Sequence, residues 1–257
     1  MKIKILSKKG EKINFILEDV TPAFANALRR IMISEIPTMA IEWVDFHNNT
    51  SALFDEIIAH RLGLLPIKFN SDKFNFVDDC KCKNKGCPSC QAVFVVEKEG
   101  PCTVYSGDMK SSNTSVKVTN PAFPIVELLK GQKIKLEAIA RIGIGKDHIK
   151  HQAANAAYQY YPEIIADGKN WKKFVNSCPR DLIKAGTSPK LSNPTECNIC
   201  RVCEEVSDGE LRIVGNENAF IFNVESVSGL TPGDIVITAG NILEQKATEF
   251  KKLLSKL

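Results

Sequence analysis

The feature that most constrains this chain is its set of nine cysteines, eight of which fall into two groups of four. The first group is Cys80, Cys82, Cys87 and Cys90, and the second is Cys178, Cys197, Cys200 and Cys203. The remaining cysteine, Cys102, is expected to be an ordinary buried or half-buried thiol. Such groups form disulfides in oxidising compartments and hold metals in reducing ones. The compartment therefore decides how the two groups are interpreted.

Composition and patterning favour a reducing compartment. The 257 residues, 44% hydrophobic and 25% charged, suit a folded chain of two or three domains. The sequence contains no run of about 20 apolar residues for a membrane span, and its first residues lack the apolar core of a signal peptide. We therefore expect a cytoplasmic protein with no membrane partner. The net charge of +4 does not by itself indicate nucleic-acid binding.

The second group has the spacing of an iron–sulfur site. Cys197, Cys200 and Cys203 repeat at every third residue, and Cys178 is followed directly by a proline. Ferredoxins of the bacterial type use such a C-x2-C-x2-C run with a remote Cys-Pro. Structural zinc sites instead pair two C-x2-C knuckles. The spacing favours a [4Fe–4S] cluster, with zinc, a [3Fe–4S] cluster, disulfides or plain buried thiols as the alternatives.

The first group reads C-x-C-x4-C-x2-C, with Gly86 and Pro88 around the last knuckle. Four thiolates in so short a loop suit one tetrahedral zinc ion, and a second iron–sulfur cluster is the main alternative. Such a loop cannot bury a core of its own, so metal binding would determine its fold.

Periodicity places helices and strands around these groups. The pair Thr21-Pro22 predicts a helix start, with an apolar stripe that ends before Pro37. A second helix is expected over residues 53–62 and a last one from Thr231-Pro232 to the end. Strands are expected over residues 2–6, 12–17, 92–96, 115–118, 134–140, 210–214 and 219–225.

The last predicted helix carries an apolar stripe that includes Phe250, Leu254 and Leu257. At about 1.5 Å per residue the helix is longer than about 30 Å. A small domain has little room to bury such a stripe, so we expect it to contact another subunit.

Catalytic patterns are missing from the sequence. The segment 143–146 (Gly-Ile-Gly-Lys) suggests a phosphate loop, but Ala140 and Asp147 stand where that motif needs glycine and a hydroxyl. The four histidines show no zincin spacing, and no acidic triad for catalytic magnesium is present. We expect no catalytic residues.

Several segments resemble the signature of the alpha-type RNA polymerase subunits. They are residues 26–31 (NALRRI), 34–37 (SEIP), 55–67 (DEIIAHRLGLLPI), 141–148 (RIGIGKDH) and 222–225 (FNVE) with Gly229-Leu230. The match covers nearly the whole chain. The first cysteine group resembles the zinc loop of the equivalent subunit in eukaryotic polymerase II, and the second resembles the cluster domain of the archaeal D-type subunit. The sequence thus resembles the D-type subunit of archaeal RNA polymerase. One difference is His151, which stands where relatives usually have tryptophan.

The resemblance implies an α+β fold with three parts. Residues 1–39 and 209–257 would form a discontinuous alpha-type dimerisation domain. Residues 40–160 would form an inserted, mixed β-rich domain with the Cys80–Cys90 metal loop, and residues 161–208 a ferredoxin-like Fe–S domain.

The resemblance also implies a non-catalytic assembly subunit of DNA-directed RNA polymerase. Its last helix would pair with an L-type subunit, the small N- and P-type subunits would join, and the large catalytic subunits would assemble on this platform. DNA would be contacted only indirectly. Residues expected at partner interfaces are Arg29, Arg30, Asp55, Glu56, His60, Arg61, Phe250 and Leu254. The alternatives are an Fe–S electron-transfer protein and a zinc-dependent nucleic-acid-binding module.

Overall fold

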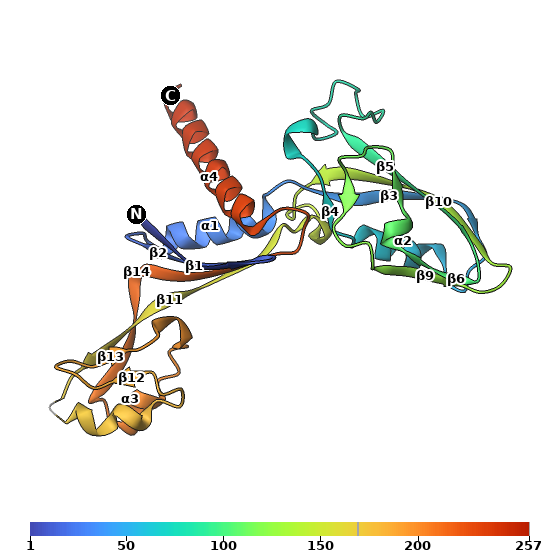
Figure 1. Ribbon diagram of the computed structural model, residues 1–257. Coiled ribbons are helices and arrows are strands. Elements are labelled where there is room, and N and C mark those ends of the chain that lie inside the picture. Colours follow the sequence, from blue (N-terminus) through green and yellow to red (C-terminus); the bar gives the residue numbers. More distant parts are fainter. Residues whose placement is uncertain (169, 257) are drawn as a thin grey trace. The chain divides into compact units, whose positions relative to one another are not determined.

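The computed structural model describes residues 1–168 and 170–256, so Leu257 lies outside the described residues. The chain is α+β and divides into two compact units (Figure 1). Unit 1 comprises Met1–Arg29 and Ala156–Val224, and unit 2 comprises Arg30–Asn155 and Glu225–Leu257. The three-part division expected from the sequence stays a prediction.

Unit 1 is built on a four-stranded sheet of order β1-β2-β14-β11. Its strands are β1 (Lys2–Lys9), β2 (Lys12–Glu18), β11 (Ala154–Ala166) and β14 (Leu211–Ser226). The first two form the predicted antiparallel hairpin, which turns at Gly10 with φ of +52°. Aromatic rings fill the sheet's core: Phe15 stacks on Phe222 with centroids 5.0 Å apart, and Tyr158 meets Phe220 edge-on at 5.3 Å.

Strand β14 corrects the expectation of two separate strands over residues 210–214 and 219–225. It is continuous, because neighbouring β11 supports the polar stretch in its middle. Asn216 Nδ2 donates to Glu163 Oε1 at 2.7 Å, and Gly215 lies against the Tyr160 side chain, where an added Cβ would be 2.6 Å from Tyr160 Cβ. The cross-strand contacts therefore override the weak local pattern.

The cysteine-bearing part of unit 1 lies between β11 and β14 in the sequence (Figure 1). Its elements are η4 (Trp171–Ser177), β12 (Ile183–Lys184), β13 (Lys190–Leu191), η5 (Pro194–Glu196) and α3 (Val202–Val206). A small buried cluster holds it together: Trp171, Leu182, Ile183, Leu211 and Ile213 with Cys197 and Cys203. At its base the Asp167 N–H donates to the Glu210 carbonyl at 3.0 Å, and Arg212 pairs with Asp167 at 3.1 Å.

Unit 2 contains an antiparallel sheet of order β3-β10-β5-β7. The strands are β3 (Thr38–Asn49), β10 (Lys133–Gly143), β5 (Gln91–Glu99) and β7 (Lys110–Ser111). Strand β10 alternates strictly, with Ile134, Leu136, Ala138 and Ala140 buried on one face. Two small sheets pair β4 (Ile67–Lys68) with β8 (Lys117–Val118) and β6 (Cys102–Tyr105) with β9 (Pro124–Leu128). Of the strand expected over residues 115–118, only Lys117 and Val118 form a strand in the structure.

Three longer helices complete the fold. Helix α1 (Pro22–Ser34) starts as predicted, because Thr21 Oγ1 accepts a hydrogen bond from the Phe24 N–H at 3.3 Å. Helix α2 (Asp55–Gly63) starts two residues later than expected. Helix α4 (Pro232–Leu254) is capped by Thr231, whose Oγ1 accepts from the Asp234 N–H at 3.2 Å. In the described part of the chain no helix is long and apolar enough to cross a membrane.

His151 lies in η3 (Ile149–His151) and is buried. Its Nδ1 lies 3.1 Å from the Thr38 carbonyl, and Thr38 Oγ1 donates to the His151 carbonyl at 2.8 Å. Burial lowers the pKa of this imidazole, so it is neutral in a packed site. The remaining short helices of unit 2 are η1 (Ser71–Lys73) and η2 (Ser106–Asp108).

Candidate functional site

The first cysteine group forms a compact four-sulfur site in the loop before β5. The four Sγ atoms lie within 4.8 Å of one another. The Cys80–Cys87 distance is 3.5 Å, and both Cys82–Cys90 and Cys87–Cys90 are 3.7 Å. A tetrahedral zinc ion with Zn–S bonds of about 2.3 Å requires sulfurs about 3.8 Å apart. The sulfur positions therefore fit a single tetrahedral ion, whereas a cluster of several irons needs its ligands further apart.

The backbone of this loop turns tightly to bring the sulfurs together. Lys83, Asn84 and Gly86 have φ values of +53°, +63° and +81°, in the left-handed region. At the last knuckle the Cys90 N–H donates to the Cys87 carbonyl at 3.0 Å, and the Cys87 N–H lies 3.3 Å from Cys90 Sγ. Gly86 and the turns of the backbone explain how a loop of eleven residues can bring four sulfur atoms together.

The thiols of this loop differ in acidity. Burial opposes ionisation of Cys82, but hydrogen bonds from Cys80, Cys90 and the Gly86 N–H bring its pKa down to about 7. Burial raises the pKa of Cys90 to about 12. Lys81, Lys83 and Lys85 are exposed on the same loop, and their charge suits a thiolate-rich site. A cation binding here displaces protons from the thiols, because only thiolates are good ligands.

The second group surrounds an open cavity instead. Cys178, Cys197, Cys200 and Cys203 all line a cavity of about 210 Å³, together with apolar side chains that include Leu182, Ile183 and Ile213. Among the described residues, a set of ligand atoms within 4.8 Å of one another is found only at the first group. The second group thus offers four sulfurs around a space, which suits a multi-atom cluster better than a single ion.

Two residues between these cysteines have strained backbones. Ile199 and Arg201 have φ values of +54° and +62°, and a β-branched residue in this region is unusual. Left-handed residues alternating with ordinary ones turn successive N–H groups toward one side, an arrangement found at many Fe–S and anion sites. Burial raises the pKa of the Cys197 and Cys203 thiols, and the positive side chains of Arg180 and Arg201 line the same cavity. These features fit an anionic group in the cavity.

The predicted interface residues of α1 and α2 are mostly at the surface. Arg30, Asp55, Glu56, His60 and Arg61 are exposed, and Arg29 is half-buried. Three of them are engaged within the chain: Arg29 donates to Asn26 Oδ1 at 3.0 Å, Arg61 Nη1 donates to the Ile125 carbonyl at 2.8 Å, and Asp55 Oδ1 accepts from Asn49 Nδ2 at 2.7 Å. His60 is exposed, so it is not a buried core histidine.

Helix α2 and the residues that flank it also expose apolar side chains. Phe54 is 73% exposed, Ile57 43% and Leu64 57%, whereas Ile58 and Leu62 are buried. The apolar positions of this segment thus divide between two faces. An exposed apolar group beside the charged residues of α2 is typical of a protein–protein contact.

Helix α4 changes character along its length. Its first half is anchored by the buried Ile235 and Ala239, and Lys246 forms an ion pair with Glu35. From Glu244 to Lys256 every residue is exposed, with Phe250 at 63% and Leu254 at 51%. Leu243, Ala247, Phe250 and Leu254 follow helical spacing and share one flank.

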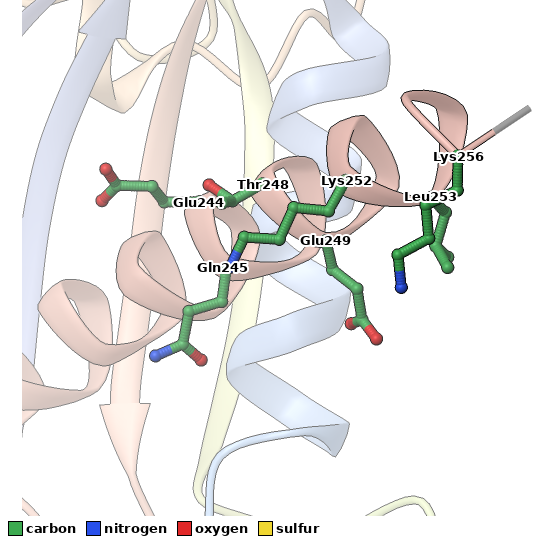
Figure 2. Close-up of a pocket in the computed structure, with 7 residues that line it drawn as sticks. All are labelled: Glu244, Gln245, Thr248, Glu249, Lys252, Leu253 and Lys256. Carbon is green, nitrogen blue, oxygen red and sulfur yellow. The ribbon is translucent and has the colours of Figure 1, made fainter.

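Figure 2 shows the other flank of α4, beside a hollow lined by residues of this helix and by Lys256, which follows it. The lining residues are Glu244, Gln245, Thr248, Glu249, Lys252, Leu253 and Lys256. All of them except Leu253 are polar or charged, so this flank is mainly polar. The second half of α4 thus has a polar flank and an uncovered apolar one.

Comparison with known proteins gives one consistent result. The sequence model of the RNA polymerase Rpb3/RpoA insert domain matches residues 44–167. DNA-directed RNA polymerase subunit Rpo3 of Methanosarcina acetivorans is 38% identical, with 100% of this chain and 99% of the relative aligned. Rpo3 of Archaeoglobus fulgidus is also 38% identical, over 99% of this chain and 98% of the relative. DNA-directed RNA polymerase II subunit rpb3 of Dictyostelium discoideum is 35% identical, over 97% and 93%.

Proposed function

Because the chain belongs to the Rpo3/Rpb3 family of DNA-directed RNA polymerase subunits, we propose that it works as an assembly platform through helix α4, helix α2 and two metal sites. The chain is a non-catalytic assembly subunit of the polymerase. The comparisons favour this function over an Fe–S electron-transfer protein. The relatives are named as polymerase subunits, and they align with this chain over nearly their whole length.

The identification made from the sequence needs one correction. The resemblance pointed to the D type of archaeal RNA polymerase, but the archaeal relatives carry the name Rpo3. We therefore assign the chain as Rpo3-type within the alpha-like subunits. The cysteine pattern suggested a subtype, whereas alignment over the whole chain identifies the type by name.

The partner of α4 is an L-type subunit. The uncovered apolar flank of the helix carries this proposal, because an exposed stripe through Phe250 and Leu254 is costly in water. The opposite flank is polar, so a partner is needed on one side only. We place this pairing in the cytoplasm, together with the rest of the polymerase.

Helix α2 contacts the second-largest catalytic subunit, and small N- and P-type subunits join the same platform. The support is the exposed set Phe54, Ile57 and Leu64 beside Asp55, Glu56 and His60. Arg61 is tied to the Ile125 carbonyl, so its role includes fixing α2. DNA contacts are indirect.

The first cysteine group holds zinc, and the second holds a [4Fe–4S] cluster, with [3Fe–4S] as the alternative. The sulfur spacing of 3.5–3.7 Å supports the zinc assignment. The cavity lined by the other four cysteines supports the cluster. Each group gives the chain a cross-link where local core is scarce.

Co-purification tests the function. A tagged full chain expressed with its polymerase partners should bring down an L-type subunit and both large catalytic subunits in equal amounts. Recovery of a ferredoxin-type redox partner without them would indicate electron transfer instead. Salt-sensitive binding of naked DNA by the chain alone would indicate a nucleic-acid-binding module.

A further inference from the structure

Gln91 and Arg141 lie beside the first cysteine group and have no part in the functions assigned so far. Gln91 is the first residue of β5 and directly follows Cys90. Arg141 lies directly opposite it on β10. The two side chains meet: Arg141 Nη2 donates to Gln91 Oε1 at 3.3 Å.

The Gln91 amide lies against the metal loop. A Cβ added to Gly86 would lie 2.7 Å from Gln91 Cδ and 2.7 Å from Nε2, so the amide covers this glycine closely. Gly86 directly precedes the ligand residue Cys87, and the Gln91 N–H donates to the Cys87 carbonyl at 3.0 Å. A continuous series of contacts therefore runs from Arg141 through Gln91 to a ligand residue.

Arg141 is an unusual residue for this position. It is half-buried on the sheet, and in the described part of the chain its Nε is buried without a hydrogen-bond partner. A buried donor without a partner destabilises the folded chain. The buried guanidinium can compensate for this loss in two ways. Its positive charge stabilises the neighbouring thiolates, and its hydrogen bond fixes the Gln91 side chain.

We propose that Arg141 and Gln91 are positioning residues for the metal at Cys80, Cys82, Cys87 and Cys90. Resting on the zinc assignment above, the pair holds Gly86 and the adjacent ligand residue Cys87 in the position that the metal requires. The Arg141 guanidinium also offsets the net negative charge of four thiolates around a divalent ion. Contacts of this outer kind typically change metal affinity by about 10–100-fold.

The chain offers matched variants for the test. Arg141→Met and Gln91→Leu remove the donor and the acceptor while keeping side-chain bulk. Lys135→Met is the control, because Lys135 also lies opposite a β5 residue, Glu97, and pairs with it at 3.3 Å away from the cysteines.

The measurement is the rate at which the full chain loses zinc to an excess of chelator. Arg141→Met and Gln91→Leu should each release zinc about 10–100-fold faster, and the double variant no faster than the worse single. Lys135→Met should stay within about threefold of the unaltered chain. Equal release rates in all variants would overturn the inference. It would also be overturned if Lys135→Met released zinc as fast as Arg141→Met.

The zinc assignment is checked separately, from the metal content of the unaltered chain and of Cys87→Ser. If Cys87→Ser leaves the zinc content unchanged, the zinc assignment and this inference both fail. If the unaltered chain holds zinc at these cysteines but release ignores Gln91 and Arg141, only the inference fails.

Discussion

Replacing Phe250 and Leu254 with aspartate should break the pairing of this chain with its L-type partner. The two side chains are 63% and 51% exposed, so half or more of each remains to be buried by a partner. Complete burial of such a side chain stabilises by about 1.5–3 kcal/mol. The remaining part is roughly 1–2 kcal/mol each, or about 2–4 kcal/mol together, which corresponds to about 30-fold to 700-fold in Kd. The buried carboxylates make this a lower bound.

The assay is a titration of the L-type subunit into the full chain, with Kd read for the double variant and for a matched control. Gln245→Asp with Thr248→Asp adds the same two charges to the polar flank shown in Figure 2. This control should bind within about threefold of the unaltered chain. Tight binding by the Phe250 and Leu254 variant, or equal losses in both double variants, would refute the assignment of the flank. Zinc and iron contents should be unchanged in both.

Three further outcomes are expected. Anaerobically prepared protein should be brown and contain zinc, and serine at Cys197, Cys200 and Cys203 should remove the colour and iron alone; a colourless protein with two zinc ions would contradict the cluster. Zinc binding should release about one more proton per ion at pH 6 than at pH 8, because the Cys82 thiol, with its pKa of about 7, is protonated below that pH and ionised above it. Calorimetry in buffers of different ionisation enthalpy measures the number of protons released. The same number at both pH values would contradict the low pKa of Cys82. The serine variant should still pair with the L-type subunit but recruit less of the large subunits; full assembly with slow elongation would make the cluster an activity element.

The helix starts were predictable because their signals are local. Thr21-Pro22 and Thr231-Pro232 each place a side-chain acceptor and a proline at the first turn, and both caps are present. Strands β3 and β11 were missed, since β3 is buried at Thr38–Ile41 and largely exposed afterwards, which gives no steady period. Their strand form depends on neighbours distant in the sequence.

The metal groups were predictable as sets of cysteines but less so as kinds of site. Spacing indicated metal at both, and the choice between one ion and a cluster depends on sulfur separations that only the folded loop defines. Gln91 and Arg141 could not be linked to the first group from sequence. The strand pairing that brings them together joins residues 50 positions apart.

The contacts at the base of the cysteine-bearing segment close it off as an insertion between two paired strands. Asp167 and Glu210 are joined by a backbone hydrogen bond, and β11 and β14 are neighbours in one sheet. In topological terms the segment is the greatly enlarged turn of a β-hairpin. A two-residue Asn-Gly turn could close the same hairpin. Loss of this segment would keep the pairing of β11 and β14 but uncover Leu211 and Ile213, so a shortened chain would need polar residues at these two positions.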